Sequence, residues 1–261
     1  MRYILILLLL SGCIFLPPKI VYRTVLTPVS TYEVSGHYTV DENGVVTYSV
    51  EGLRMKVEYM TDDALNAMFP EDSNRGRFST NPYTYGNWVD PVLGYTPNRF
   101  TVFRVTVIND TYAKVLLDPL KALLYTDRGE IFHAYGIPSS SPYESFERYY
   151  RATRGQSGNE FYRFDLRMGN VRSSAYLEDQ KVFKGESYGG LIAFDPLDKE
   201  VRRVRVVLKE VVLKFDAFDR PLETMDVPFE FNRTVEQYVL KPHQEGETSL
   251  STGAPKGNGE R

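Results

Sequence analysis

The run Leu53-Arg54-Met55-Lys56-Val57-Glu58-Tyr59 alternates apolar and charged side chains without exception. Successive side chains of a β-strand point to opposite faces, so this pattern places four apolar side chains on one face and three charges in water. Antiparallel sheets that bury only one face contain strands of this kind. The run therefore predicts a half-buried antiparallel strand.

The segments on either side of this run extend the pattern. Two candidate strands precede it, Tyr32 to Val40 and Val45 to Val50, and Asp41-Glu42-Asn43-Gly44 joins them. The Asn-Gly pair supplies the positive φ that tight hairpin turns need. Thr61-Asp62-Asp63 follows and is typical of a helix start, because a hydroxyl side chain caps the first turn and acidic residues suit it. This helix is expected to end before Pro70.

Strand patterns continue through the second half of the chain. The run from Phe100 to Ile108 is apolar on both faces and predicts a central strand. In the long β stretch from Val201 to Phe215 the apolar parity slips after Leu208, which predicts a bulge at Lys209-Glu210. Further strands are expected at the following segments: Val115 to Leu117, Leu120 to Tyr125, Ile131 to Ala134, Tyr188 to Phe194, and one containing Val227, Phe229 and Phe231.

One segment has a different period. Between about residues 143 and 179, Phe161, Phe164, Met168 and Val171 recur at helical spacing. Many short strands with turn signals, interrupted once by helix, favour an antiparallel β-sandwich with a helical insertion.

The amino terminus predicts export. A single positive charge at Arg2 precedes an unbroken apolar run from Ile4 to Leu10, which is too short to span a bilayer. The next residues are Ser11, Gly12 and Cys13, and Cys13 is the only cysteine of the chain. A lone thiol forms no internal disulfide. One interpretation is an ordinary signal peptide or apolar anchor with an incidental cysteine.

The segment Leu10-Ser11-Gly12-Cys13 also resembles the lipobox of bacterial lipoproteins. This resemblance implies that residues 1–12 are a signal peptide and that Cys13 carries the lipid that binds the membrane. Several acyl chains give stable anchoring. Ile14 is not the aspartate linked to inner-membrane retention, so the resemblance implies the outer membrane if the host is Gram-negative. Residues 13–30, with Pro17, Pro18 and Pro28, are expected to form a tether or an edge segment.

A second resemblance concerns the sandwich. The strand from Phe100 to Ile108, the turn Asp127-Arg128-Gly129, the segment Lys184-Gly185-Glu186 leading into Gly190 to Phe194, and a terminal hairpin are similar to telokin-like, immunoglobulin-type domains of secreted bacterial proteins. The resemblance covers residues 100–232 and implies an extracytoplasmic protein without catalytic residues to transfer. It places an immunoglobulin-like sandwich at 100–240, after β hairpins and an aromatic loop at 31–99. The polar tail, residues 241–261, is expected to be disordered.

Composition and residue spacing argue against catalysis and against a metal or other cofactor. His37, His133 and His243 are not at metal-ligand spacing from one another. The chain contains neither a Gly-x-Ser-x-Gly elbow nor a glycine-rich phosphate loop. A net charge of −3 and a pI near 5.8 offer no electrostatic footprint for nucleic acid. No enzyme activity is therefore expected.

Two groups of residues are candidate binding sites. The first is an aromatic platform in the loop before Phe100, formed by Tyr83, Tyr85, Trp88 and Tyr95. The alternative is that these rings cover an edge of the sandwich. The second is a basic row that would contact anionic lipid or an acidic partner, formed by Arg148, Arg151 and Arg154. The alternative is a solvated helix face neutralised by Glu144 and Glu147.

These features predict a lipid-anchored envelope protein that acts as a non-catalytic protein-interaction or scaffolding module. The alternative function is glycan or cell-wall binding, in which Trp88 and its neighbouring tyrosines stack on sugar rings.

Overall fold

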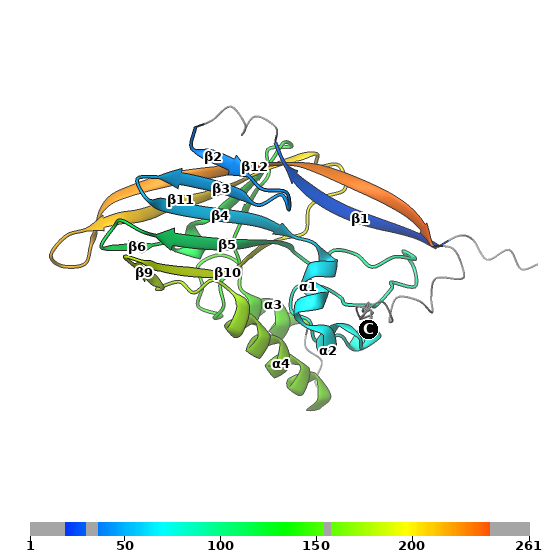
Figure 1. The fold of residues 1–261 in the computed structure, drawn as a ribbon. Coiled ribbons are helices and arrows are strands. Elements are labelled where there is room, and N and C mark those ends of the chain that lie inside the picture. Colours follow the sequence, from blue (N-terminus) through cyan, green and yellow to red (C-terminus); the bar gives the residue numbers. More distant parts are fainter. Residues whose placement is uncertain (1–18, 30–35, 154–157, 241–261) are drawn as a thin grey trace, which may run out of the picture.

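The structure is a computed structural model that describes residues 19–29, 36–153 and 158–240. The signal segment, Cys13, Arg154 and the tail 241–261 lie outside the described residues. Figure 1 shows two layers of strands that overlap in the view, with the helices gathered below them. The protein is mainly β, and every strand pairing within the two sheets is antiparallel.

One sheet has five strands, which Figure 1 shows from β2 at the top to β10 at the bottom. In spatial order they are β10 (Glu186–Phe194), β5 (Thr101–Asn109), β4 (Leu53–Met60), β3 (Val46–Val50) and β2 (Tyr38–Val40). The alternating run predicted as a strand is β4, and its apolar residues Leu53, Met55 and Val57 are completely buried. The run from Phe100 is β5, which pairs on both sides and is therefore an interior strand, as predicted.

This sheet contains the predicted hairpin, and it also spans the domain boundary expected at residue 100. The predicted turn joins β2 to β3, and Gly44 has a φ of +80°, which an L-side chain rarely adopts. Strand β4 pairs with β5 from Leu53↔Asn109 to Met60↔Val102. A boundary at residue 100 therefore falls between two neighbouring strands of one sheet.

The other sheet has seven strands, which again pair antiparallel. The main order is β1 (Lys19–Pro28), β12 (Pro221–Leu240), β11 (Arg203–Phe215), β6 (Lys114–Leu116) and β9 (Lys181–Phe183), while β7 (Leu123–Thr126) pairs with β11 and β8 (Ile131–His133) with β7. The register of β11 against β12 shifts between Leu208 and Val211, which confirms the predicted bulge.

Two expectations need correction in this sheet. Residues 19–28, which were assigned to the tether, form the edge strand β1; this is the edge alternative for that proline-containing segment, with Pro28 as its last residue. The start of the strand predicted at Leu120 is instead a 3₁₀ turn, η3 (Pro119–Lys121), because Pro119 and the capping Asp118 favour a turn there.

The helices lie together at one end of the five-stranded sheet, and Figure 1 shows them below it. They are α1 (Asp62–Met68), α2 (Pro70–Ser73), η2 (Gly76–Phe78), α3 (Phe146–Ala152) and α4 (Gly158–Ser174). The Thr61 hydroxyl accepts a hydrogen bond from the Ala64 amide and caps α1, as its sequence predicts. Helices α3 and α4 occupy the segment 143–179 that shows helical spacing. No helix in the described part of the chain has the length and apolarity to cross a bilayer.

Two clusters of buried side chains hold these layers together. The main core lies between the two sheets and combines residues of β4 and β5 with residues of β11 and β12. The second core lies between the five-stranded sheet and the helices; its largest rings are Tyr83, Phe100, Phe146 and Tyr150. Both faces of β5 are therefore buried, because Phe103 faces the first core and Val102 the second.

Candidate functional site

The aromatic loop, residues 71–98, is held in place by the buried side chain of Asn81. Its amide nitrogen donates to the Leu65 carbonyl at 3.1 Å and to the Ser73 hydroxyl at 2.9 Å. Its amide oxygen accepts from the backbone N–H groups of Tyr83 and Thr84 at 2.9 and 3.3 Å. Buried polar groups of this kind are costly unless they are paired, so the network favours one conformation of the loop.

The four rings predicted as a platform do not lie together on one exposed surface. Tyr83 is completely buried against Phe146, and its hydroxyl hydrogen-bonds to Ser174 at 2.8 Å. The rings of Tyr85 and Trp88 are half-buried and lie 5.5 Å apart. Tyr95 is half-buried on the wall of a separate groove.

The described members of the basic row are engaged within the fold. Arg148 donates to the Ser139 and Ser141 carbonyls at 2.6 and 2.7 Å and so holds the loop before α3. Arg151 pairs with Glu147 one turn earlier on the same helix. Arg154 is outside the described residues, so the position of the full row is not defined.

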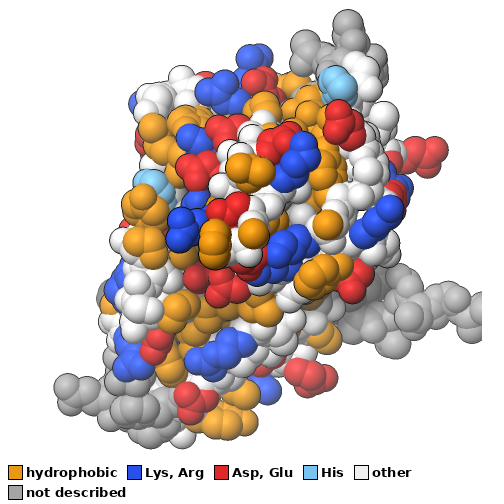
Figure 2. Space-filling model, turned by 90° about the vertical axis from the view of Figure 1, so that its left-hand side faces the viewer, with side chains coloured by type: hydrophobic (Ala, Val, Ile, Leu, Met, Phe, Trp, Pro, Cys, Tyr) orange, Lys and Arg blue, Asp and Glu red, His pale blue; other side chains and the backbone are white. Residues whose placement is uncertain are grey.

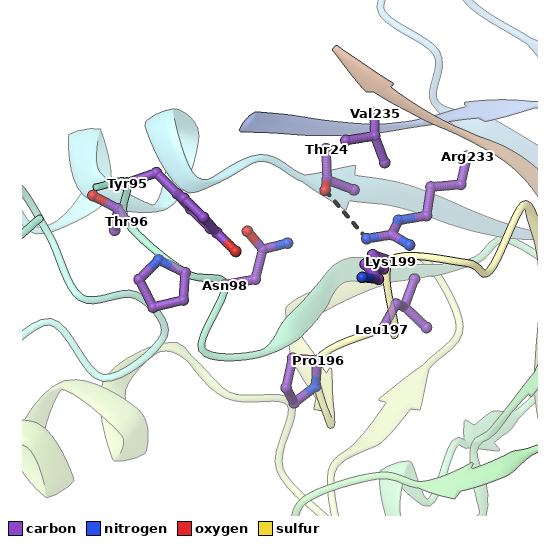
Figure 3. Close-up of a pocket in the computed structure, with 10 residues that line it drawn as sticks. Thr24, Tyr95, Thr96, Asn98, Pro196, Leu197, Lys199, Arg233 and Val235 are labelled. Atoms are coloured by element: carbon purple, nitrogen blue, oxygen red, sulfur yellow. Dashed lines mark hydrogen bonds between the residues drawn. The ribbon is translucent and has the colours of Figure 1, made fainter. Parts of the chain in front are cut away.

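The larger of two notable cavities is an open groove of about 470 Å³, shown in Figure 3. Tyr95 and Asn98 lie on one side of it, and Thr24, Arg233 and Val235 lie on the other. Its lining consists of Thr24, Tyr95, Thr96, Pro97, Asn98, Pro196, Leu197, Lys199, Arg233 and Val235. The groove therefore joins the aromatic loop to the edge strand β1, to β12 and to the loop after β10.

Arg233 holds the far wall of this groove together. Its guanidinium donates to the carbonyls of Asp198 and Val201 and, at 3.4 Å, to the Thr24 hydroxyl, the bond drawn in Figure 3. All three acceptors are neutral, and burial lowers the pKa of this arginine. Arg233 and the exposed Lys199 make the groove basic.

The second cavity, of about 250 Å³, is an open pocket lined by residues of η2, α3, α4 and the aromatic loop, together with Arg99. We call it the arginine pocket. It is lined by Arg77, Phe78, Tyr85, Arg99, Tyr149, Tyr150, Thr153, Glu160, Arg163 and Arg167. It therefore gathers four guanidinium groups and one carboxylate.

Apart from Tyr85 and Tyr95, the residues that line the two cavities were not among those predicted from the sequence as binding residues. Arg163 and Arg167 are four residues apart on a helix, and this spacing indicates a shared face. No comparable signal links them to Arg99 or Arg77, because those residues come from other elements and meet only in the folded protein.

The chain shows a different charge distribution at the opposite end of the sandwich. Figure 2 shows that end face-on, with basic and acidic side chains interspersed. The ion pairs that involve β11 include Lys121 with Glu210 and Lys214 with Glu223. Charge of one sign gathers instead in the arginine pocket.

Neither of the two histidines that the structure describes lies in a cluster of metal-binding side chains. His37 is exposed and its Nδ1 lies 3.2 Å from the Ser49 carbonyl oxygen, while His133 stacks on Tyr143 at 3.7 Å between ring centroids. His243 lies outside the described residues. Within those residues no three His, Cys, Asp or Glu side chains are grouped closely enough to hold a metal ion.

No protein-family model, no curated protein and no solved structure matches this chain. The candidate sites therefore rest on the geometry of the two cavities and of the sheet edge beside them.

Proposed function

We propose that this protein is a non-catalytic interaction module of the cell envelope, anchored by lipid on Cys13, which binds an extended segment of a partner protein along β1. The observation that carries this proposal is that β1 is a ten-residue edge strand beside the groove of Figure 3. We also propose that the sandwich is of the immunoglobulin type, with α3 and α4 as its helical insertion.

The exposed edge of β1 is suited to strand addition. Strand β1 pairs with β12 from Lys19↔Leu240 to Pro28↔Phe231, and no strand of the described chain pairs with its other edge. Residues 233–240 of β12 pair only with β1, so the two strands extend past the sandwich as the arm at the right of Figure 1. The free edge of a strand presents unpaired N–H and C=O groups, to which an extended peptide adds as a new strand.

The groove at the base of this arm supplies side-chain recognition. Thr24 of β1 contributes to its wall, so a segment bound along β1 passes directly beside it. Tyr95 and Leu197 offer apolar contact, and Lys199 and Arg233 favour an acidic group. Main-chain pairing would provide affinity, and the groove would provide selectivity for a segment that carries an acidic side chain.

The proposed anchor would keep this arm near the membrane. Lys19 follows Cys13 by six residues, and six extended residues span at most about 20 Å. A partner of the arm is therefore expected among proteins that lie at or in the same membrane.

Site-specific photo-crosslinking in intact cells tests the interaction. A photo-reactive side chain at Thr27, which is exposed on β1, or at Tyr95 should give a discrete crosslinked product with an envelope protein. The control position is Phe218, which is 78% exposed in the β11–β12 turn at the other end of the sandwich. No product from Thr27 and Tyr95, or the same product from all three positions, would contradict the proposal.

Glycan binding is a second candidate, because the Tyr95 ring lies beside the polar side chains of Thr96 and Asn98. Tyrosine rings stack on sugars while neighbouring polar groups bind the hydroxyls. Retention on purified cell-wall polysaccharide that Tyr95→Ala abolishes would favour this function. Because the Trp88 ring packs against Tyr85 and Trp88 is not among the residues that line the groove, Trp88→Ala separates a groove site from the aromatic platform.

A further inference from the structure

The arginine pocket contains more positive charge than its acidic groups balance. Arg163 forms an ion pair with Glu160 within the pocket wall. Arg77, Arg99 and Arg167 have no carboxylate within 4.0 Å among the described residues. Within the described part of the chain, three guanidinium groups therefore line one small cavity without a direct ion-pair partner.

Arg99 is held by neutral groups that leave its charge uncompensated. It is 8% exposed, and one terminal nitrogen donates to the Asn81 carbonyl at 3.1 Å and to the Tyr150 hydroxyl at 3.3 Å. Its guanidinium carbon lies 4.0 Å from the centre of the Tyr85 ring. Its Nε is removed from solvent and has no hydrogen-bond partner in the described structure.

Arg167 has the same kind of environment. Its side chain donates to the Ser79 carbonyl at 2.8 Å, and its Nε is buried without a partner among the described residues. Burial, and then the nearby charge of Arg99, lower the pKa of Arg167. Placing like charges together away from water is unfavourable unless a counter-charge binds between them.

The carboxyl group of Asp62 lies near Arg99 but is only a partial counter-charge. Asp62 on α1 interacts with Arg99, but burial raises the pKa of this carboxyl to about 7. This carboxyl is therefore about half protonated near neutral pH, so that it offsets only part of the arginine charge.

We propose that the arginine pocket binds the phosphate group of a small anionic ligand. Guanidinium groups bind phosphate oxygens through paired hydrogen bonds, and three uncompensated charges match a phosphate dianion better than a single carboxylate. The volume of about 250 Å³ holds a phosphate with a short organic body, which the rings of Phe78, Tyr85 and Tyr149 would contact. This site is distinct from the β1 groove and does not depend on the proposed function.

Two sources would supply this chemistry, namely a soluble phosphate monoester and the headgroup of a phospholipid. Isothermal titration of the detergent-solubilised full-length protein distinguishes them with two probes. Glycerol 3-phosphate represents the soluble source, with glycerol as its uncharged control. Dihexanoyl-phosphatidylglycerol below its micelle concentration represents the headgroup, with dihexanoyl-phosphatidylcholine as its zwitterionic control.

The variants assign any binding to the pocket. Arg167→Gln is expected to weaken binding of the productive probe at least tenfold, because it removes a guanidinium that lines the cavity. Arg77→Gln, at an exposed position on η2, is expected to weaken it at least threefold without disturbing the fold. Arg203→Gln is the matched charge control, because Arg203 is exposed on β11, outside the pocket lining, and should change the affinity less than twofold.

Either probe, bound in preference to its control and weakened by these substitutions, supports the proposal and identifies the source. If Arg167→Gln fails to fold by circular dichroism, Arg77→Gln alone decides. Binding of neither probe, or binding that Arg77→Gln and a folded Arg167→Gln leave unchanged, would overturn it.

Discussion

At the scale of single residues, the buried polar groups of the aromatic loop decide its shape. Asn81 pairs with α1, α2 and its own loop, and its carbonyl also accepts from Arg99. Asn81 thus connects the loop to the arginine pocket, through its side chain on one side and its backbone carbonyl on the other. Asp62 differs from Asn81, because burial destabilises the charged form of its carboxyl group.

The protonation of Asp62 should make the stability of the protein depend on pH. Burial raises the pKa of this carboxyl from 3.8 to about 7, with Asp63 adding to the rise and Arg99 opposing it. A pKa raised in the folded state means that the folded protein binds more protons than the unfolded chain between pH 4 and pH 7. The contribution of Asp62 is therefore fully present below pH 4 and is lost as the pH rises through 7.

The substitution Asp62→Asn removes this dependence, because an amide does not ionise. The Tm of the variant relative to the wild type should rise when the pH changes from 5 to 8, as measured by thermal unfolding. Asp165→Asn, at an exposed position of α4, serves as the control and should show the same difference from the wild type at both pH values. A relative Tm of Asp62→Asn that falls with pH would show that the carboxylate is stabilised instead.

At the scale of elements, the bulge in β11 keeps both halves of the strand in the core. Leu208 and Val211 are both buried although their spacing breaks the two-residue period. At the bulge Glu210 adopts a left-handed backbone conformation with a φ of +52°. Its backbone amide donates a hydrogen bond to the Asp226 side chain at 2.8 Å. The apolar pattern predicts this bulge because a continuous strand would expose half of these residues.

The strained backbone at Glu210 gives a second prediction. Glu210→Val should lower the free energy of unfolding by about 1–2 kcal/mol, because a β-branched residue tolerates this region of φ poorly. Arg203→Val, at an exposed position on the same strand, is the control and should change stability by less than about 0.5 kcal/mol. Equal urea-unfolding curves for the two variants would show that the bulge carries no backbone strain.

At the scale of the whole molecule, the sandwich, the arm and the proposed anchor define where each site would lie. The arm begins six residues after Cys13, and the arginine pocket lies among the helices on the other side of the five-stranded sheet from the main core. The two candidate sites are therefore separate surfaces of one protein.

The anchor itself is tested by Cys13→Ser. The wild type should fractionate with membranes, and mass spectrometry of the mature protein should show Cys13 as its first residue with attached lipid. The serine variant should lose the lipid and its membrane association, because serine provides no thiol for acylation. Ser11→Ala keeps a small residue before the cleavage point and should behave as the wild type. An unmodified Cys13 or an intact Met1 would contradict the anchor.

The positions of many strands along the chain were predictable from the sequence, but their order in the two sheets and the sites were not. Strands β4, β5 and β11 follow from short-range alternation, which depends only on neighbouring residues and the period of a strand. Strand β1 was not distinguishable from a tether, because its formation depends on pairing with β12 about two hundred residues away. Likewise, Tyr83 and Trp88 belong to one aromatic loop, and only the packing of Phe146 and Ser174 decides that Tyr83 is buried.

The sequence by itself determined the mainly β class, the half-buried faces of the strands and the position of the helical segment, since each is a local periodicity of apolar residues. Tertiary structure alone decided that residues 19–28 form an edge strand and which arginines share a cavity. Arg77 of η2, Arg99 in the loop before β5, and Arg163 and Arg167 of α4 are spread over ninety residues of the chain. Their charges act together only because the folded chain brings these segments to one cavity.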